Sequence, residues 1–280
     1  MNSEVRISDD GLRTSSYGNG HSDPPASHAQ APQGARKLRS NLTMSLGNAL
    51  GSLARKVNRR FGIQSLLNGE PRPPVGGFDL RGEKFLDWGF VCANLPHGHK
   101  RALEIGPGRS PIIPAMLAVG YDVTAIDISS DLSKQFAGIR FIKGDFTAVQ
   151  FEAGFEVVVA CSTVEHVGLS GRYGSVEDAD GDIKTMQKVH GLLEPDGLLF
   201  LTIPMGVDGV HRPFHRVYGR ERLPLLLEGF QEVRSHFLVK EPHGPWHVGD
   251  RDAALEYPAS AQRYALGEFV LRKKSADEIG

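Results

Sequence analysis

The chain has 280 residues, of which 40% are apolar and 23% are charged, and its formal net charge is −1. This composition suits a globular protein with a sizeable core, and the near-zero charge argues against a surface built throughout to bind nucleic acid. Two cysteines, Cys92 and Cys161, exclude a disulfide scaffold and a four-cysteine zinc site, and we expect reduced thiols in a cytoplasmic protein.

The charge is distributed unevenly along the chain. Residues 1–75 carry ten Lys and Arg against five Asp and Glu, whereas residues 76–280 carry 22 against 28. No stretch reaches the roughly 18 apolar residues of a membrane span, and the N-terminus lacks the apolar core of a signal peptide. A basic arm is therefore joined to an acidic body, and the acidic body argues against DNA or RNA as the main substrate.

Residues 1–75 are predicted to form an N-terminal arm outside the folded domain. Residues 1–35 are rich in Ser, Gly, Asn and Pro, which predicts disorder. Leucines at three- and four-residue spacing and seven nearby Lys and Arg indicate a basic amphipathic helix at about 40–62. Such a helix could make peripheral contact with an anionic membrane, or pack its apolar stripe on the body or a partner.

Residues 76–280 show an alternation of strands and helices that predicts one domain. Strands are expected at 101–105, 121–126, 139–142, 155–161, 198–203, 231–239 and 264–272, and helices at 83–95, 111–119, 180–193 and 220–227. This alternation is typical of a mostly parallel sheet with helices on both faces. The long connection at 241–263 is interpreted as a substrate-side lid, in which Trp246 either contacts substrate or anchors the packing.

A glycine turn follows the first predicted strand. Gly106 and Gly108 allow a ligand to approach the backbone at the carboxyl end of the sheet, where ligands bind in open parallel sheets. The third glycine of a dinucleotide fingerprint is missing, because Ile112 and Ile113 occupy that region. The turn alone is also compatible with a tight bend that binds nothing.

Two carboxylates follow the next two predicted strands. Asp127 ends the second strand, where an acid suits hydrogen bonding to ribose hydroxyls. Asp145 and Phe146 follow the third strand, where they could bind the amino group and ring face of an adenine. Three such features at the ends of successive strands make a nucleotide-like ligand the preferred interpretation.

Together these segments resemble the class I S-adenosylmethionine-dependent methyltransferases. The matching segments lie within residues 83–240 and comprise Leu103–Gly108, Asp127, Gly144–Phe146, residues 155–167 and residues 194–203. The resemblance implies a Rossmann-like α/β fold with a seven-stranded, mostly parallel sheet in the order 3-2-1-4-5-7-6, in which strand 7 is antiparallel. It also implies S-adenosylmethionine as the cofactor.

The resemblance implies which residues of this chain would lie near the cofactor. The implied cofactor-binding residues are Glu104, Gly106, Gly108, Asp127, Ile128, Asp145, Phe146, Cys161 and Ser162. Glu104 would orient the methionine amino group, and the residues that end the fourth strand would lie near the sulfonium. Cys161 could equally be a small buried apolar residue.

The reaction needs an aligned acceptor and, where required, a base. The candidate catalytic residues are His166, His215, Glu165 and Tyr218. The resemblance favours His166, although Glu165 and His166 could serve only to order their loop. Predicted substrate contacts are Met205, His211, Arg216 and Trp246. We predict no metal site, because Pro213 argues against a helix that would align His211 with His215.

The favoured hypothesis is methyl transfer to an oxygen or nitrogen of a small molecule, such as a sugar, a glycan end or a secondary metabolite. One alternative is a cofactor-binding scaffold subunit without turnover. Another is a nicotinamide-dependent Rossmann enzyme, against which the missing third glycine and Gly144–Phe146 both count. The sequence predicts no oligomeric state.

Overall fold

The computed structural model describes residues 80–129, 131, 136, 138–151 and 154–279. The predicted arm of residues 1–75, with its amphipathic helix at about 40–62, lies outside these residues. Its disorder and its membrane contact remain predictions, as does the cytoplasmic location. Within the described residues, no helix combines the length and the apolar character that crossing a membrane requires.

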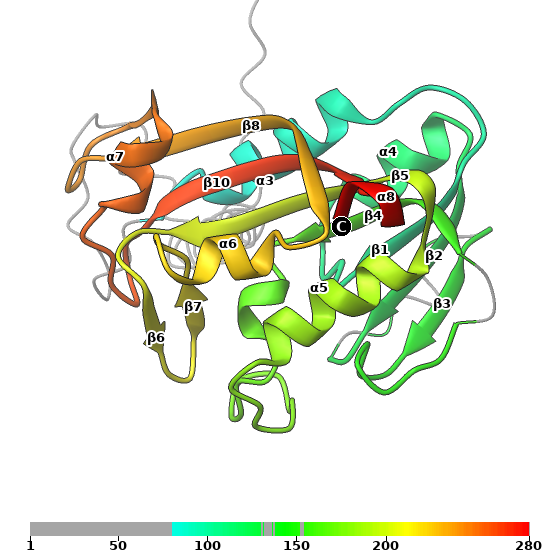
Figure 1. The fold of residues 1–280 in the computed structure, drawn as a ribbon, viewed down its shortest axis with the longest axis horizontal. Coiled ribbons are helices and arrows are strands. Elements are labelled where there is room, and N and C mark those ends of the chain that lie inside the picture. Colours follow the sequence, from blue (N-terminus) through cyan, green and yellow to red (C-terminus); the bar gives the residue numbers. More distant parts are fainter. Residues whose placement is uncertain (1–79, 130, 132–135, 137, 152–153, 280) are drawn as a thin grey trace, which may run out of the picture. The chain divides into compact units, whose positions relative to one another are not determined.

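An eight-stranded sheet organises the fold, with the strand order β3-β2-β1-β4-β5-β10-β8-β9 (Figure 1). The strands are β1 (Arg101–Ile105), β2 (Asp122–Asp127), β3 (Arg140–Lys143), β4 (Phe155–Cys161), β5 (Leu193–Met205), β8 (Phe230–Lys240), β9 (Trp246–Gly249) and β10 (Ala265–Lys273). β1 pairs in parallel with β2 and β4, β2 with β3, and β4 with β5. β10 runs antiparallel to both β5 and β8.

The expectation of a seven-stranded sheet is wrong by one strand. If β8 and β10 are counted as the sixth and seventh strands, they stand in the expected order beside β5. β9 then adds an eighth strand antiparallel to β8, so the order of the whole sheet differs from the expected one. The fold class, a mostly parallel α/β sheet covered by helices, is confirmed.

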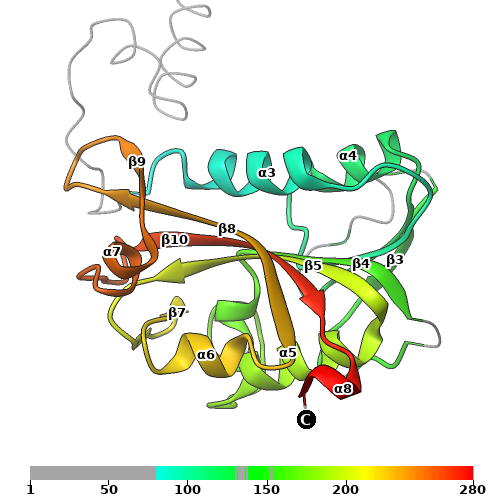
Figure 2. The same ribbon diagram turned by 45° about the horizontal axis from the view of Figure 1, so that its top comes forward.

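Helices cover the two faces of the sheet (Figure 2). α3 (Glu83–Asn94) and α4 (Ile112–Ala118) lie on one face, and α5 (Gly181–Leu192) and α6 (Arg222–Leu226) lie on the other. The central strands are therefore buried on both sides and read as continuous apolar runs. In β4, Val157 joins the core under α3 and α4, whereas Val158 joins the core under α5 and α6.

Local sequence explains several element boundaries. α3 begins after Gly82, which adopts a left-handed φ of 87°, and it ends just before Leu95 and Pro96. A residue that precedes proline is disfavoured in the helical conformation, which explains the end of α3. The predicted turn at 194–197 is an irregularity inside β5, because Phe155 pairs with Leu193 but Val157 already pairs with Leu198.

The predicted lid at 241–263 contains regular structure. It includes β9 and the short helix α7 (Arg251–Leu255), which begins where the Asp250 carboxylate accepts a 2.7 Å hydrogen bond from the backbone N–H of Ala253. The region is structured because β8 offers an edge with which β9 pairs. The sequence analysis also missed the hairpin of β6 (Gly209–His211) and β7 (His215–Val217), the 3-10 turn η2 (Val164–His166) and α8 (Ala276–Ile279).

Candidate functional site

A pocket lies at the carboxyl ends of β1, β2, β3 and β4, where parallel strands meet the loops that follow them. Eight of the predicted site residues line this pocket: Gly106, Gly108, Asp127, Ile128, Asp145, Phe146, Ser162 and His166. These residues are spread over about 60 positions of the sequence, from the glycine turn to η2. The topology therefore brings together most of the cofactor residues and one candidate base.

The glycine turn after β1 forms one wall of the pocket. Gly106 and Gly108 adopt left-handed φ values of 66° and 54°. A Cβ at Gly106 would lie 2.6 Å from the Thr163 side chain, so close packing against the chain itself requires this glycine. At Gly108 a Cβ would meet no atom within 4 Å, so this backbone borders open space in the pocket. Gly108 thus fits the predicted close approach of a ligand better than Gly106.

Two carboxylates mark the ends of β2 and β3. Asp127 is largely buried, and its Oδ1 accepts hydrogen bonds of 2.7 and 3.0 Å from the backbone N–H and hydroxyl of Ser129. Its Oδ2 accepts a 3.1 Å bond from the Gly108 N–H. Asp145 Oδ1 is held likewise by the N–H and hydroxyl of Thr147, each at 2.8 Å. Both carboxylates are fixed in orientation by neighbours two residues along the chain.

The loop after β3 is held by a cation from α5. Lys188 Nζ donates to the carbonyl oxygens of Phe146, Thr147 and Val149 at 2.6, 3.2 and 2.5 Å. The same ammonium lies 4.9 Å from the centre of the Phe146 ring. This arrangement fixes Phe146 as a buried wall of the pocket beside Asp145.

Two predicted cofactor residues do not line the pocket. Glu104 is buried beneath the glycine turn, where the Ser110 hydroxyl donates a 2.8 Å bond to its Oε1 and its Oε2 has no partner. Burial raises the pKa of Glu104 to about 8. Cys161 packs among apolar residues under α3 and accepts a 3.5 Å contact from the Thr202 hydroxyl, and burial raises the pKa of its thiol. Both residues support the pocket from behind.

His166 lines the same pocket from η2, the turn that follows β4. Its Nδ1 lies 2.6 Å from the carbonyl oxygen of Phe214. A carbonyl only accepts, so Nδ1 carries the proton of the neutral ring and Nε2 presents a lone pair. Burial lowers the pKa of His166 to about 3, which keeps the ring neutral.

Glu165 and His215 lie behind His166. Glu165 Oε1 is 3.5 Å from His166 Nε2, its Oε2 has no partner, and burial raises its pKa to about 8. The His215 ring centre lies 6.5 Å from that of His166 and 4.9 Å from that of Tyr264. Burial also lowers the pKa of His215, to about 4. Neither Glu165 nor His215 lines the pocket. Of the four candidate catalytic residues, only His166 does so.

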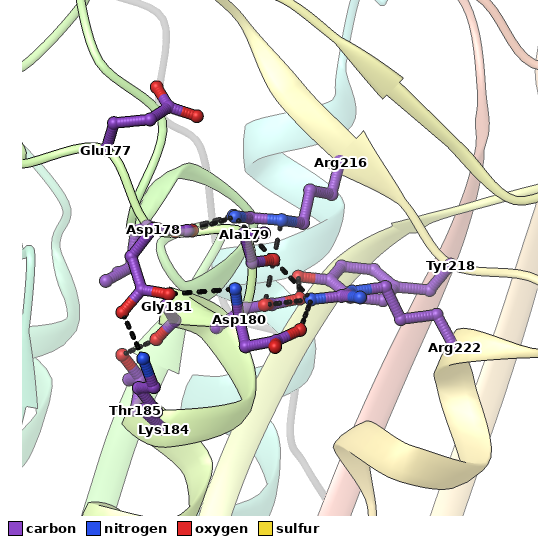
Figure 3. Close-up of polar contacts among 12 residues, drawn as sticks. Glu177, Asp178, Ala179, Asp180, Gly181, Lys184, Thr185, Arg216, Tyr218 and Arg222 are labelled. Carbon is purple, nitrogen blue, oxygen red and sulfur yellow. Dashed lines mark hydrogen bonds and ion pairs between the residues drawn. The ribbon is translucent and has the colours of Figure 1, made fainter.

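Tyr218 and Arg216 are placed in a buried network instead of the pocket (Figure 3). The Tyr218 hydroxyl donates a 3.1 Å bond to Asp182 Oδ2, and no part of Tyr218 is exposed. The Arg216 guanidinium donates to backbone carbonyls on both sides of the loop that follows η2. Neighbours thus enclose both groups outside the pocket, so this structure lends no support to Tyr218 as a base or to Arg216 as a substrate contact, and both stay predictions.

Met205, His211 and Trp246 also lie away from the pocket. Met205 is fully buried against Gly267, where a Cβ would meet its sulfur at 2.3 Å. His211 lies in the β6–β7 hairpin with its ring centre 5.7 Å from that of His215. Trp246 donates to the carbonyl of Arg81 at 2.8 Å and packs in the cluster around Val217 and Tyr264. These are packing contacts, and the contact of Trp246 with substrate stays a prediction.

The sequence analysis missed several residues of the pocket and its surroundings. Thr163, Val167, Tyr173 and Ser175 line the pocket from the segment after β4. Asp87 on α3 accepts a 2.7 Å bond from the Ser162 hydroxyl, and burial raises its pKa to about 7. Lys84, one turn earlier, lies 3.8 Å from the same carboxylate. The available signal for Asp87 was an acidic residue within the predicted helix at 83–95.

No group of three or more His, Cys, Asp or Glu side chains among the described residues could hold a metal ion. His211, His215 and His166 approach one another only as ring contacts. The expectation that the site lacks a metal stays a prediction.

Several solved structures are similar to this one. The structure of the cyclase SpnF has a TM-score of 0.50 and 15% identity, covering 80% of this chain and 96% of that chain. The Burkholderia thailandensis 1,6-didemethyltoxoflavin-N1-methyltransferase, solved with bound 1,6-didemethyltoxoflavin and S-adenosylhomocysteine, has a TM-score of 0.47 and 17% identity over 90% of this chain and 94% of its own. The N-methyltransferase NodS from Bradyrhizobium japonicum WM9, with S-adenosylhomocysteine, has a TM-score of 0.46 and 17% identity over 70% and 87%.

Comparison with curated proteins found no match. One family model matches the chain over residues 113–273, which is more than half of its length. That model is DUF268, described as a Caenorhabditis protein of unknown function. Its span begins in α4 and ends with β10, so it includes most of the pocket. The chain belongs to the DUF268 family.

Proposed function

We propose that this chain binds S-adenosylmethionine in the pocket and transfers its methyl group to an oxygen or nitrogen of a small molecule. The observation that carries the proposal is that Gly108, Asp127, Asp145 and His166, which lie far apart in the sequence, line one pocket at the carboxyl ends of the strands. We call the ends of β1, β2 and β3 the cofactor side, and η2 with the segment that follows it the acceptor side.

The residues of the cofactor side fit the cofactor. Open space at Gly108 leaves room beside the backbone, and the oriented Asp127 carboxylate can accept hydrogen bonds from ribose hydroxyls. Asp145 can accept from an exocyclic amine, while Phe146 gives an apolar surface for a ring. When bound, S-adenosylmethionine supplies an electrophilic methyl group, so the protein needs only to align an acceptor and manage its proton.

His166 is suited to take that proton. The Phe214 carbonyl holds the Nδ1–H tautomer, which leaves Nε2 as the accepting atom of a ring that lines the pocket. A neutral imidazole can accept a proton from an acceptor hydroxyl or amine and later release it to solvent. Glu165 Oε1 lies 3.5 Å from Nε2; burial keeps this carboxyl group largely neutral near pH 7, and a positive charge on His166 would favour its ionised form.

The acceptor is proposed to be a small molecule, with sugar or glycan hydroxyls and amines of secondary metabolites as the candidate classes. The fold does not by itself specify methyl transfer, because SpnF shares it and is a cyclase. A cofactor-binding subunit without turnover therefore remains the alternative. A nicotinamide enzyme is disfavoured, because Ile112, at the start of α4, occupies the region of the third glycine.

The test is incubation of the full chain with methyl-labelled S-adenosylmethionine and a small-molecule extract, followed by mass spectrometry. We expect a labelled product that depends on the protein. If S-adenosylhomocysteine binds but no extract gives labelled product, the scaffold alternative is supported. If neither binding nor transfer is found and NADH binds instead, the proposed function is wrong.

A further inference from the structure

The acceptor side depends on one long segment, the β4–α5 loop, which we define as residues 167–180 between η2 and α5. Its two ends touch each other. Asp178 donates a 2.9 Å backbone bond to the Gly168 carbonyl, and a Cβ at Gly168 would lie 2.2 Å from the Asp178 oxygen. A Cβ at Gly181 would lie 2.8 Å from the Gly168 Cα. The loop is therefore closed at its base, with glycines where its ends meet.

Arg216 on β7 joins these two ends through its guanidinium. Nη1 donates a 2.5 Å bond to the Val167 carbonyl at the start of the loop. Nη2 donates bonds of 2.9 and 3.2 Å to the carbonyls of Asp178 and Ala179 at its end. Figure 3 shows the Arg216 side chain extending toward Asp178 and Ala179. A planar fork with several fixed donors can span both ends at once, which a lysine ammonium cannot do as well.

The Arg216 charge is enclosed and balanced. Arg216 is 1% exposed, and its Nε lies 3.6 Å from Oδ1 of Asp182, which is fully buried. Arg222 pairs with the same carboxylate through bonds of 2.9 and 2.6 Å, and Tyr218 donates to it as well. Removing one partner from such a buried network leaves charge unpaired, so the position of Arg216 is tightly determined.

The loop held in this way carries part of the pocket wall. Val167, Tyr173 and Ser175 line the pocket, and the Tyr173 ring meets His166 edge-on with ring centres 5.1 Å apart. The Arg172 guanidinium lies over the Tyr173 ring at 4.9 Å. Any shift of the loop base would therefore move groups that touch the proposed base.

We propose that Arg216 is a positioning residue: by tying the two ends of the β4–α5 loop, it holds Tyr173 and Ser175 as the acceptor-side wall beside His166. The catalytic part of this inference rests on the proposed function, in which His166 is the base. Arg216 touches neither cofactor nor acceptor. It acts through the loop, and it is thereby distinct from the substrate contact that the sequence had suggested.

The test compares the full chain with Arg216→Lys, using Arg220→Lys as the matched control. Arg220 makes only exposed ion pairs with Asp252 and Glu256. Trypsin can cleave after Arg172, an exposed residue within the loop. We expect cleavage at Arg172 to be at least about tenfold faster in Arg216→Lys than in the wild type and the control, because the loop base opens more often. Equal cleavage rates would overturn the proposal.

A second measurement separates positioning from general destabilisation. Calorimetry with S-adenosylhomocysteine is expected to show a Kd about threefold to tenfold higher in Arg216→Lys. If Arg216 acts through the loop, the double variant Arg216→Lys with Tyr173→Ala raises the Kd by less than the product of the two fold-changes that the single variants cause. Independent, multiplicative effects would contradict the inference.

The outcomes distinguish this inference from the proposed function. A wild-type chain that does not bind S-adenosylhomocysteine contradicts the proposed function, whereas the cleavage comparison still decides whether Arg216 holds the loop. If Arg216→Lys does not fold, Gly168→Ala opens the loop base from the other side, because its Cβ would collide with the Asp178 oxygen. An unchanged cleavage rate at Arg172 in that variant would contradict the inference.

Discussion

The two sides of the pocket are built in different ways. On the cofactor side, Asp127 and Asp145 are oriented by Ser129 and Thr147, each two residues along the chain. On the acceptor side, His166 is oriented by Phe214, which is 48 residues away, and the loop after η2 is held by Arg216, which is 37 to 49 residues from its partners. The carboxylates of the cofactor side are thus oriented largely within local turns, to which Gly108 and Lys188 add contacts from farther along the chain, whereas the acceptor side depends on distant segments.

A cationic side chain holds one loop on each side of the pocket, and the two side chains, Lys188 and Arg216, differ in burial. Lys188 reaches three carbonyls of one short loop after β3 and keeps partial contact with solvent. Arg216 is enclosed, and it joins two ends of a loop that are eleven or more residues apart. The comparison teaches that the acceptor side should be the more sensitive of the two to single substitutions.

The largest effect is expected for His166→Gln. This change removes the proposed base and leaves the carboxylates of the cofactor side in place. We expect formation of labelled product to fall by about 10² to 10⁴-fold, with binding of S-adenosylhomocysteine within about threefold of the wild type. Mass spectrometry and calorimetry measure the two quantities. His99→Gln, at an exposed position before β1, is the control, and retained turnover in His166→Gln would remove His166 from the role of base.

An intermediate effect concerns Glu104 beneath the glycine turn. Its pKa of about 8 in the folded protein lies above the ordinary value of 4.5, so the folded chain binds more protons than the unfolded chain between these pH values. The free energy of unfolding therefore falls as the pH rises from about 4.5 to about 8. In Glu104→Gln we expect this fall to be smaller by at least about 1 kcal/mol.

Denaturant unfolding at pH 5 and pH 8 measures the difference. Glu228→Gln, at an exposed side chain after α6, is the control and should keep the wild-type pH dependence. A Glu104→Gln variant with the full wild-type fall in stability would show that Glu104 is not the group responsible.

The smallest effect is expected for Tyr218→Phe. The substitution deletes the hydroxyl that donates to Asp182 but leaves both Arg222 bonds to that carboxylate. We expect a loss of about 1 kcal/mol in the free energy of unfolding, with the Kd for S-adenosylhomocysteine unchanged within about twofold. A large loss of binding or turnover without a change in stability would restore Tyr218 as a catalytic candidate.

Much of the sheet could be predicted from the sequence because its central strands are buried on both faces. β1 and β4 were placed at their observed bounds, and the order of β1 to β5 was implied by the resemblance to the methyltransferases. β9 was missed because it is a four-residue edge strand, with Val248 exposed and no apolar run to mark it. Its existence depends on the edge that β8 provides.

The candidate site was predictable where its geometry is local. The glycine turn, Asp127, Asp145 and Phe146 follow strands directly, and all of them line the pocket. Arg216 and Tyr218 were expected at the site because polar residues after a strand suggest substrate contacts, whereas here they contact the carbonyls of the β4–α5 loop and Asp182. Nothing in the sequence near Arg216 identifies partners that lie 37 to 49 residues away.

Calorimetric titration with S-adenosylhomocysteine tests the central claim most directly. The comparison is between the full-length wild type, Asp127→Ala, and Asp122→Ala at the opposite, exposed end of β2. We expect one binding site in the wild type, at least about tenfold weaker binding in Asp127→Ala, and wild-type binding in Asp122→Ala. Absence of binding to the folded wild type, or equal affinity in all three proteins, would contradict the assignment of this pocket to the cofactor.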